Sequence, residues 1–270
     1  MGNIPFAVTT PVSISRVGLK ARDAEKLAAY YRAVVGLDEL ARSEGTITLG
    51  AAGRPLLVVE ADPAASPDDP RSAGLFHTAF LLPSRTDLGR WIRHAIEKQI
   101  RIEGASDHIV SEALYLTDPE GNGIEIYADK PHETWKWDGA RIEMATLKLD
   151  IPSVVAEVPA GDAGWQGAPE NSVIGHVHLR VGDPEIAEKW WHDEFNFDTV
   201  AKYGNEAAFL SSGGYHHHIG ANSWRSAGAG QRDPSRSGLS WVEMQSKDAK
   251  AGSEKTDPWG TVIRTVPAKG

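Results

Sequence analysis

The stretch IGHVHLRVGDPEIAEKWWHDEFNF, residues 174–197, decides the fold that we expect for this chain. Its first part alternates apolar and polar side chains, which is typical of a strand. Asp183 then stands as an N-cap, with Pro184 at the first helical position. The apolar residues that follow recur at helical spacing, at Ile186, Trp190, Trp191 and Phe195. The stretch therefore predicts a strand followed by a capped amphipathic helix.

The same order occurs twice more in the preceding half of the chain. ISRVGLKARDAEKLAAYYRAVVGLDEL, residues 14–40, has Asp23 as its cap, and Gly36 ends its helix. GLFHTAFLLPSRTDLGRWIRHAIEKQI, residues 74–100, has Ser84 or Thr86 as its cap. Short alternating segments with turn residues follow each helix and predict two or three antiparallel strands. The chain therefore contains a repeated βαβββ module.

A fourth module is present only in part. SGLSWVEMQS, residues 237–246, matches the first strand of the second module, and TDPWGTVIRTV, residues 256–266, matches its last strand, which contains TDPEGNGIEIY. About ten residues separate the two, too few for a helix and two strands at ~1.5 Å and ~3.3 Å rise per residue. We expect an α+β fold with three full modules and a truncated fourth.

The stretch between modules two and three is rich in Pro, Gly and Trp at its ends and is interpreted as a linker. The predicted organisation is residues 1–130 for modules one and two, 131–173 for the linker, and 174–270 for module three and the truncated fourth module.

Composition narrows the functional classes. The chain has 270 residues, a formal net charge of -9 and no cysteine, so thiolate nucleophiles and cysteine-ligated metals are excluded. The charges are not grouped in blocks, which argues against nucleic acid and against an anionic membrane surface as partners. No leader or membrane-length apolar run is visible, so a cytoplasmic location is expected.

The motifs within the modules resemble a known group of proteins. HVHL on a first strand and DPEGNGIEIY on a last strand are similar to the vicinal oxygen chelate superfamily, which includes glyoxalase I, bleomycin resistance proteins and extradiol dioxygenases. SEALYLTDPEGNGIEIYADKP, RIEMATLKLDIPSVV and AFLSSGGYHHHIGANSW resemble the four-module catechol 2,3-dioxygenase group. The resemblance implies paired half-barrel sheets around a metal cleft.

The resemblance also implies where metal ligands come from: one position on the first strand of a module and one on its last strand. In modules two and three these positions hold His77, Glu125, His176 and His218. In modules one and four they hold Arg16, a residue near Leu57, Trp241 and Arg264, which do not bind metals. This partition favours a metal-binding site between modules two and three and a site that cannot bind metal between modules one and four. The alternative is that sequential modules pair, which would leave two incomplete sites.

The register of the last strand of module three stays open by one residue. Counting from Gly214 makes His218 the ligand, whereas counting from Gly213 makes it His217. A slip of one residue reverses the face of a strand. We favour His218.

The implied activity is cleavage of a catechol-like aromatic by O2 on a divalent metal, with Fe(II) favoured and Ni, Mn or Zn as alternatives. His178 or His216 is the candidate base for the second phenolic proton. A fourth protein ligand would leave only two open positions and favour a glyoxalase-like isomerase. A ligand-sequestering protein without metal is the third hypothesis. The exposed sheet edge left by the truncated module suggests a homodimer.

Overall fold

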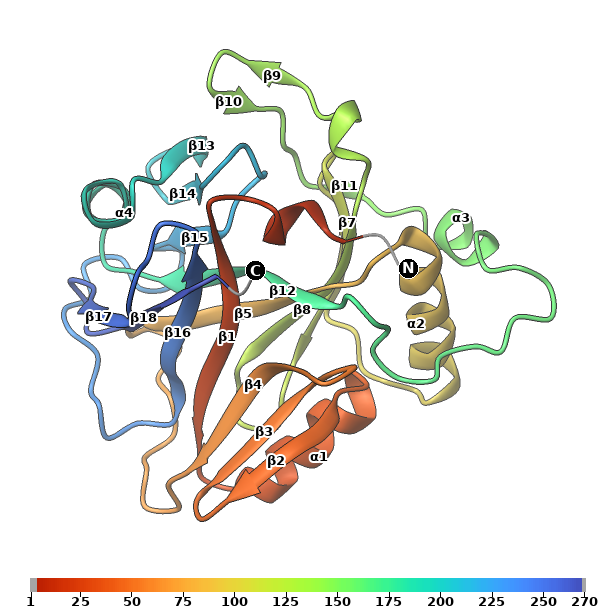
Figure 1. Ribbon diagram of the computed structural model, residues 1–270, viewed down its shortest axis with the longest axis horizontal. Helices are drawn as coiled ribbons and strands as arrows, with labels where there is room; N and C mark the ends of the chain where they lie inside the picture. Colours follow the sequence, from red (N-terminus) through yellow and green to blue (C-terminus); the bar gives the residue numbers. More distant parts are fainter. Residues whose placement is uncertain (1–3, 269–270) are drawn as a thin grey trace.

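The computed structural model describes residues 4–268, and its strands form two large sheets (Figure 1). Module one consists of β1 (Val12–Ala21), α1 (Ala24–Val34), β2 (Asp38–Ser43), β3 (Thr46–Ala51) and β4 (Arg54–Ala61). Module two consists of β5 (Gly74–Leu81), α2 (Arg85–Glu97), β6 (Gly104–Asp107), β7 (Ser111–Thr117) and β8 (Gly123–Asp129). Module three consists of β12 (Val173–Arg180), α4 (Pro184–Phe195), β13 (Asp198–Tyr203), β14 (Ala207–Ser211) and β15 (Ile219–Asn222). The predicted α+β fold of repeated βαβββ modules is confirmed.

Each helix of the repeat begins at the residue type that the sequence indicates. The side chains of Asp23, Ser84 and Asp183 accept hydrogen bonds from backbone N–H groups in the first turn of α1, α2 and α4. These caps satisfy donors that have no partner within the helix. Of the two candidates in module two, Ser84 rather than Thr86 is therefore the cap.

The truncated fourth module keeps three strands and no helix. Its strands are β16 (Gly238–Ser246), β17 (Ser253–Thr256) and β18 (Val262–Pro267). The short segment between the matched strands thus has room for the single strand β17, which forms an edge of its sheet and is exposed along its whole length.

The modules pair across the chain rather than in sequence. The nine-stranded sheet has the order β11-β6-β7-β8-β5-β12-β15-β14-β13, and the seven-stranded sheet has the order β17-β18-β16-β1-β4-β3-β2. Module two therefore joins module three through the antiparallel pair β5 and β12, and module four joins module one through β16 and β1. The predicted cross-pairing is confirmed, and the sequential alternative is wrong.

The segment between modules two and three contains two short helices and three short strands. These are η2 (His132–Thr134), β9 (Trp137–Asp138), β10 (Arg141–Ile142), β11 (Leu147–Lys148) and α3 (Ile151–Ala156), and a further short helix, η1 (Phe6–Val8), precedes β1. The hairpin of β9 and β10 extends from the body of the molecule at the top of Figure 1. Only β11 joins a large sheet, by pairing with β6.

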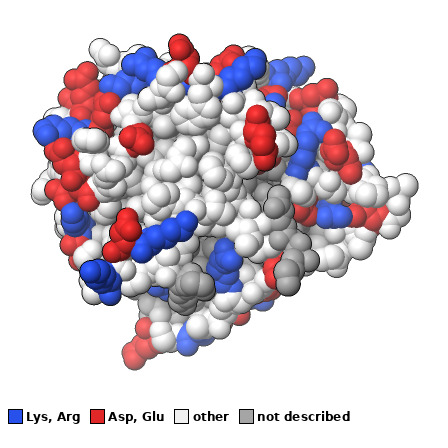
Figure 2. All heavy atoms as spheres, turned by 45° about the horizontal axis from the view of Figure 1, so that its top comes forward, with Lys and Arg blue, Asp and Glu red and all other residues white. Residues whose placement is uncertain are grey.

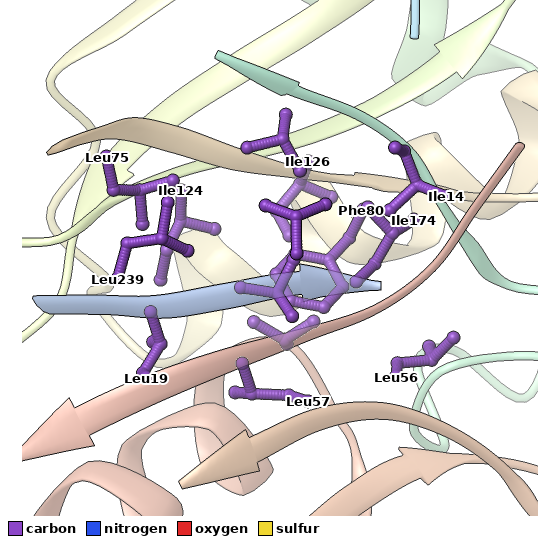
Figure 3. Close-up of a cluster of buried hydrophobic side chains, with 14 of the residues drawn as sticks. Ile14, Leu19, Leu56, Leu57, Leu75, Phe80, Ile124, Ile126, Ile174 and Leu239 are labelled. Carbon is purple, nitrogen blue, oxygen red and sulfur yellow. The ribbon is translucent and has the colours of Figure 1, made fainter. Parts of the chain in front are cut away.

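One buried apolar cluster fills the space between the two sheets. Figure 3 shows Leu19, Leu57 and Leu239 from the seven-stranded sheet facing Leu75, Phe80, Ile124, Ile126 and Ile174 from the nine-stranded sheet. Residues of α1 and α2, including Tyr31 and Trp91, belong to the same cluster. Burial of this apolar surface is the main force that holds the halves together. The opposite face of the nine-stranded sheet carries side chains that do not belong to this cluster.

The face drawn in Figure 2 has no large patch of one charge, because acidic and basic side chains are mixed around an uncharged centre. Among residues 4–268, no helix has both the length and the apolar content needed to cross a membrane.

Candidate metal centre

Two histidines and a glutamate meet on the face of the nine-stranded sheet that points away from the core. His77 lies on β5, Glu125 on β8 and His176 on β12, and these three strands are adjacent. The neighbours of Glu125, Ile124 and Ile126, belong to the core cluster, so alternation places the carboxylate on the other face, as the sequence predicts.

The ligand atoms of these three residues form a small triangle. Nε2 of His77 lies 3.3 Å from Nε2 of His176, and Oε2 of Glu125 lies 3.0 Å from the first and 3.1 Å from the second. Two ligands at right angles, each about 2.1 Å from a shared ion, stand about 3 Å apart. The three edges therefore match one face of an octahedron around a divalent cation. We call His77, Glu125 and His176 the triad.

The three residues of the triad are buried, and their surroundings shift the pKa values of His176 and Glu125. His77 is 6% exposed, and Glu125 and His176 are each 2% exposed. Burial lowers the pKa of His176 to about 4, so its imidazole is neutral at pH 7. Burial by itself would raise the pKa of Glu125, but the contacting imidazoles of His176 and His77 hold it well below its usual range. A buried carboxylate beside two imidazoles is a donor set that a divalent metal would complete.

The orientation of the His176 ring is set by a chain of buried hydroxyl groups. Nδ1 of His176 lies 3.2 Å from the hydroxyl of Tyr127, which lies 2.8 Å from the hydroxyl of Tyr215. The Tyr215 hydroxyl donates in turn to Oδ1 of Asp129 at 3.3 Å. The Tyr127 hydroxyl occupies space beside the backbone of Gly175, where a Cβ atom would lie only 1.7 Å from it. Gly175 is thus required for this close approach.

His218 does not join the triad. Its Nε2 donates to the backbone oxygen of Ala7 at 3.0 Å, and its Nδ1 accepts from the backbone N–H of Ser212 at 3.3 Å. Both ring nitrogens of His218 therefore form hydrogen bonds with the backbone, and one of these partners, Ala7, lies in η1. The prediction that His218 completes the site does not agree with this geometry.

The reason is the length of the turn before the last strand of module three. In module two, β8 begins at Gly123, two residues after Gly121, whereas in module three β15 begins only at Ile219, five residues after Gly214. A fixed count from the glycine therefore reaches different points of the two strands. The strand register shows the true equivalence: Ala79 pairs with Glu125, and His178, at the same place on β12, pairs with Gly220.

The position equivalent to Glu125 in module three thus carries no side chain, and His178 fills the space. A Cβ atom on Gly220 would lie 1.9 Å from Nε2 of His178. The ring of His178 stacks on that of His77, with centroids 4.7 Å apart, and its Nδ1 lies 3.2 Å from Nδ2 of Asn222. With the amide donating to Nδ1, the proton of the neutral ring sits on Nε2. Burial lowers the pKa of His178 well below its usual value.

The neighbours His216 and His217 take different positions. Nε2 of His216 lies 2.9 Å from Oδ1 of Asp129, and its Nδ1 lies 2.8 Å from Nδ1 of His217. The ring of His217 approaches that of His176 to 4.1 Å between centroids, and its buried Nε2 has no hydrogen-bond partner among residues 4–268. His217, rather than His218, is therefore the member of the histidine run that lies beside the triad.

Tyr127 and Tyr115 are site residues that were missed in the sequence. Tyr127 lies two residues after Glu125 on the same strand, so strand alternation alone places it on the triad face. Tyr115 lies opposite Glu125 on β7, and its hydroxyl lies 2.6 Å from Nε2 of His108. Burial and the nearby charge of Glu125 raise the pKa of Tyr115 well above its usual value.

Comparison with known proteins places this geometry in a family. A sequence model of the glyoxalase/bleomycin resistance protein/dioxygenase superfamily matches residues 13–126. A catechol-2,3-dioxygenase of Bacillus subtilis (strain 168) is 42% identical over 230 residues, which cover 84% of this chain and 80% of the relative. The chain belongs to this superfamily. The predicted resemblance is confirmed, as is the prediction of a dioxygenase-type oxidoreductase.

Solved structures of this superfamily share the fold. Glyoxalase I from Zea mays superposes with a TM-score of 0.56 at 12% identity, over 97% of this chain and 94% of that one. A Bacillus subtilis protein solved as a candidate dioxygenase superposes with a TM-score of 0.60 at 11% identity, over 97% of this chain and 86% of that one. At these identities the likeness concerns the arrangement of the modules. The dioxygenase relative and the triad together support a divalent metal.

Proposed function

We propose that this protein is a metal-dependent extradiol-type dioxygenase that opens a catechol-like aromatic ring with O2. The observation that carries the proposal is the triad, in which two imidazoles and one carboxylate form one face of a coordination sphere. Two histidines and a carboxylate with open positions are the ligand set of non-haem Fe(II) oxygenases. The relationship to a catechol-2,3-dioxygenase supports the same reaction class.

The number of ligands favours ring cleavage over isomerisation. Three protein ligands leave three of six octahedral positions, which is enough for both oxygens of a catecholate and for O2. A fourth ligand from His218 would have left only two. When bound, the metal would supply a Lewis acid for the catecholate oxygens and an electron path from the ring to O2. We propose Fe(II) for this role, with Ni, Mn or Zn as the alternatives that would suit isomerase chemistry.

His178 is the residue that we propose for proton transfer. Its ring stacks on that of His77, a member of the triad, and Asn222 holds its Nδ1. An imidazole that is neutral and oriented by a neighbour can hold or move one proton at Nε2. His216, the other candidate, has Asp129 and His217 at its two nitrogens, so we assign it to holding that side of the site in place.

Aromatic side chains lie next to His178 and suit a flat substrate. The ring centroids of Phe76, Phe209 and Trp224 lie 6.1, 5.4 and 6.1 Å from that of His178. Trp224 is 42% exposed, so this group reaches from the buried triad to the surface. We propose that the aromatic ring of the substrate packs against this group.

The test is oxygen consumption with catechol by protein purified without added metal, analysed for its metal content and then loaded with Fe(II) under nitrogen. We expect one O2 to be consumed per catechol, because both oxygen atoms enter the ring-opened acid. We expect loss of metal and of uptake in His176→Ala and Glu125→Gln. His94→Ala, in which a histidine of α2 that bonds Ala33 is removed, is the matched control.

Two outcomes would overturn the proposal. Metal bound by the triad without oxygen uptake for catechol or its substituted forms would favour an isomerase on a non-redox metal. Absence of metal in both the purified and the loaded protein would favour a ligand-sequestering protein.

A further inference from the structure

The seven-stranded sheet contains the counterpart of the metal centre. In the nine-stranded sheet, β12 pairs with β5 with irregularities between Ile174 and His176 and between His178 and Leu179. In the seven-stranded sheet, β1 pairs with β16 with irregularities between Ile14 and Arg16 and between Gly18 and Leu19. The two pairs therefore share the same construction, with bulges at equivalent points.

This equivalence identifies the residues at the three ligand positions of the second site. Gly18 pairs with Trp241 as His178 pairs with His77, and Glu243 pairs with Arg264 as Ala79 pairs with Glu125. Arg16, Trp241 and Arg264 thus stand where His176, His77 and Glu125 stand in the triad. The guanidinium of Arg264 lies over the Trp241 ring, 4.5 Å from its centroid. Fixed positive charge replaces the metal-binding groups.

A cavity lies on this face of the sheet. Its volume is about 660 Å³, within the range of pockets that hold small organic molecules. Most of its lining is apolar, and a few polar groups converge on it. The lining residues used below are Val8, Arg16, Arg54, Pro55, Glu243 and Val266.

The charged groups of the cavity favour an anion. Within residues 4–268, Glu243 is the one carboxylate in the lining, and it is already paired: Nε and Nη2 of Arg16 donate to its two oxygens at 2.8 and 2.6 Å, and Ser15 donates at 2.7 Å. Nη1 of Arg16 has no hydrogen-bond partner among residues 4–268. In the same range, no carboxylate lies within ion-pair distance of Arg54. Two guanidinium groups therefore have free N–H donors at the cavity, whereas both carboxylate oxygens of Glu243 already accept hydrogen bonds.

We propose that this cavity is a second binding site, distinct from the triad, for a small organic anion with an apolar body of two-ring size. Arg54 and the free edge of Arg16 bind the anionic group, and Val8, Pro55 and Val266 contact the apolar body. The site binds without metal, because Arg16 is the residue from the three counterpart positions that lines the cavity, and an arginine does not bind a metal. The proposal does not depend on the activity of the triad.

The probe is 1-anilinonaphthalene-8-sulfonate, an aromatic anion whose fluorescence rises in an apolar site. Its uncharged analogue, N-phenyl-1-naphthylamine, has the same rings without the sulfonate. We expect one molecule of the anion per chain, and a two- to fivefold weaker affinity for the anion alone in Arg54→Gln, about the effect of one partly exposed charge pair. Arg101→Gln, which removes another exposed arginine in module two, is the matched control.

A second variant tests the location. Val266→Trp fills the cavity from β18, so binding of both probes is expected to fall at least tenfold while oxygen uptake at the triad is unchanged. Arg54→Glu reverses the charge and provides the same test if Val266→Trp does not fold. The proposal is overturned if anion binding is unchanged in Arg54→Gln and Arg54→Glu, or if His176→Ala abolishes it while Val266→Trp, folded, does not.

Discussion

Removal of one hydroxyl group, in Tyr127→Phe, tests whether the buried chain of hydroxyls sets the metal affinity of the triad. The Tyr127 hydroxyl lies 3.2 Å from Nδ1 of His176 and 2.8 Å from the hydroxyl of Tyr215, and Tyr127 is fully buried. Phenylalanine keeps the ring and its packing, so the main loss is the partner of His176. Loss of a group that orients a metal-bound histidine costs about 10- to 100-fold in metal affinity, or about 1.4–2.7 kcal/mol.

The stability of the metal-free protein should fall as well. His176 Nδ1 would be left buried without a partner, which costs about 1–3 kcal/mol. Tyr215 keeps its bond to Asp129, so the rest of the chain of hydroxyls remains. The expected result is therefore a folded protein that unfolds at lower urea concentration and binds metal more weakly.

The assay is anaerobic titration of the metal-free protein with Fe(II) against a competing fluorescent chelator, with urea unfolding in parallel. Tyr30→Phe is the control, because the Tyr30 hydroxyl donates to Thr117 at 3.1 Å far from the triad. A dissociation constant for Fe(II) within twofold of that of the parent protein, in a folded Tyr127→Phe variant, would refute the reasoning.

Three further predictions follow from the same geometry. His218→Asn should keep the metal content of the parent, because both ring nitrogens of His218 bond the chain; loss of metal in a folded variant would return His218 to the ligand set. Burial lowers the pKa of His218 to about 3, below the usual 6.5, so below pH 6.5 the unfolded chain binds more protons. Urea unfolding of the metal-free protein should then show up to about 2 kcal/mol less stability per such histidine at pH 5 than at pH 6.5, and a flat profile would contradict this. Phe80→Ala, between the sheets and 1% exposed, should cost about 3–5 kcal/mol, whereas Ile96→Ala, 68% exposed, should leave the unfolding midpoint nearly unchanged.

The sequence by itself determined the modules, favoured the pairing that the sheets show, and predicted the three residues of the triad as candidate ligands. Periodicity and caps located the repeated strands and helices, because alternation and N-capping are local properties. The distribution of ligand-type residues predicted that module two joins module three. His77 and His176 could be found because the first strands of the modules align with one another in the sequence. Glu125 could be found because its neighbours Ile124 and Ile126 are apolar, so alternation places its side chain on the face opposite the core.

Only the tertiary structure decided the last strand of module three. The turn from Gly213 to His218 is longer than its counterpart in module two, and a count along the sequence cannot show where pairing resumes. Pairing of His178 with Gly220 places a glycine at the fourth ligand position and turns His218 toward Ala7. Strand register depends on hydrogen bonds to the neighbouring strand, and one residue of slip exchanges the two faces. The number of protein ligands, and with it the chemistry favoured at the triad, therefore depends on the pairing of β12 with β15, which cannot be read from the sequence alone.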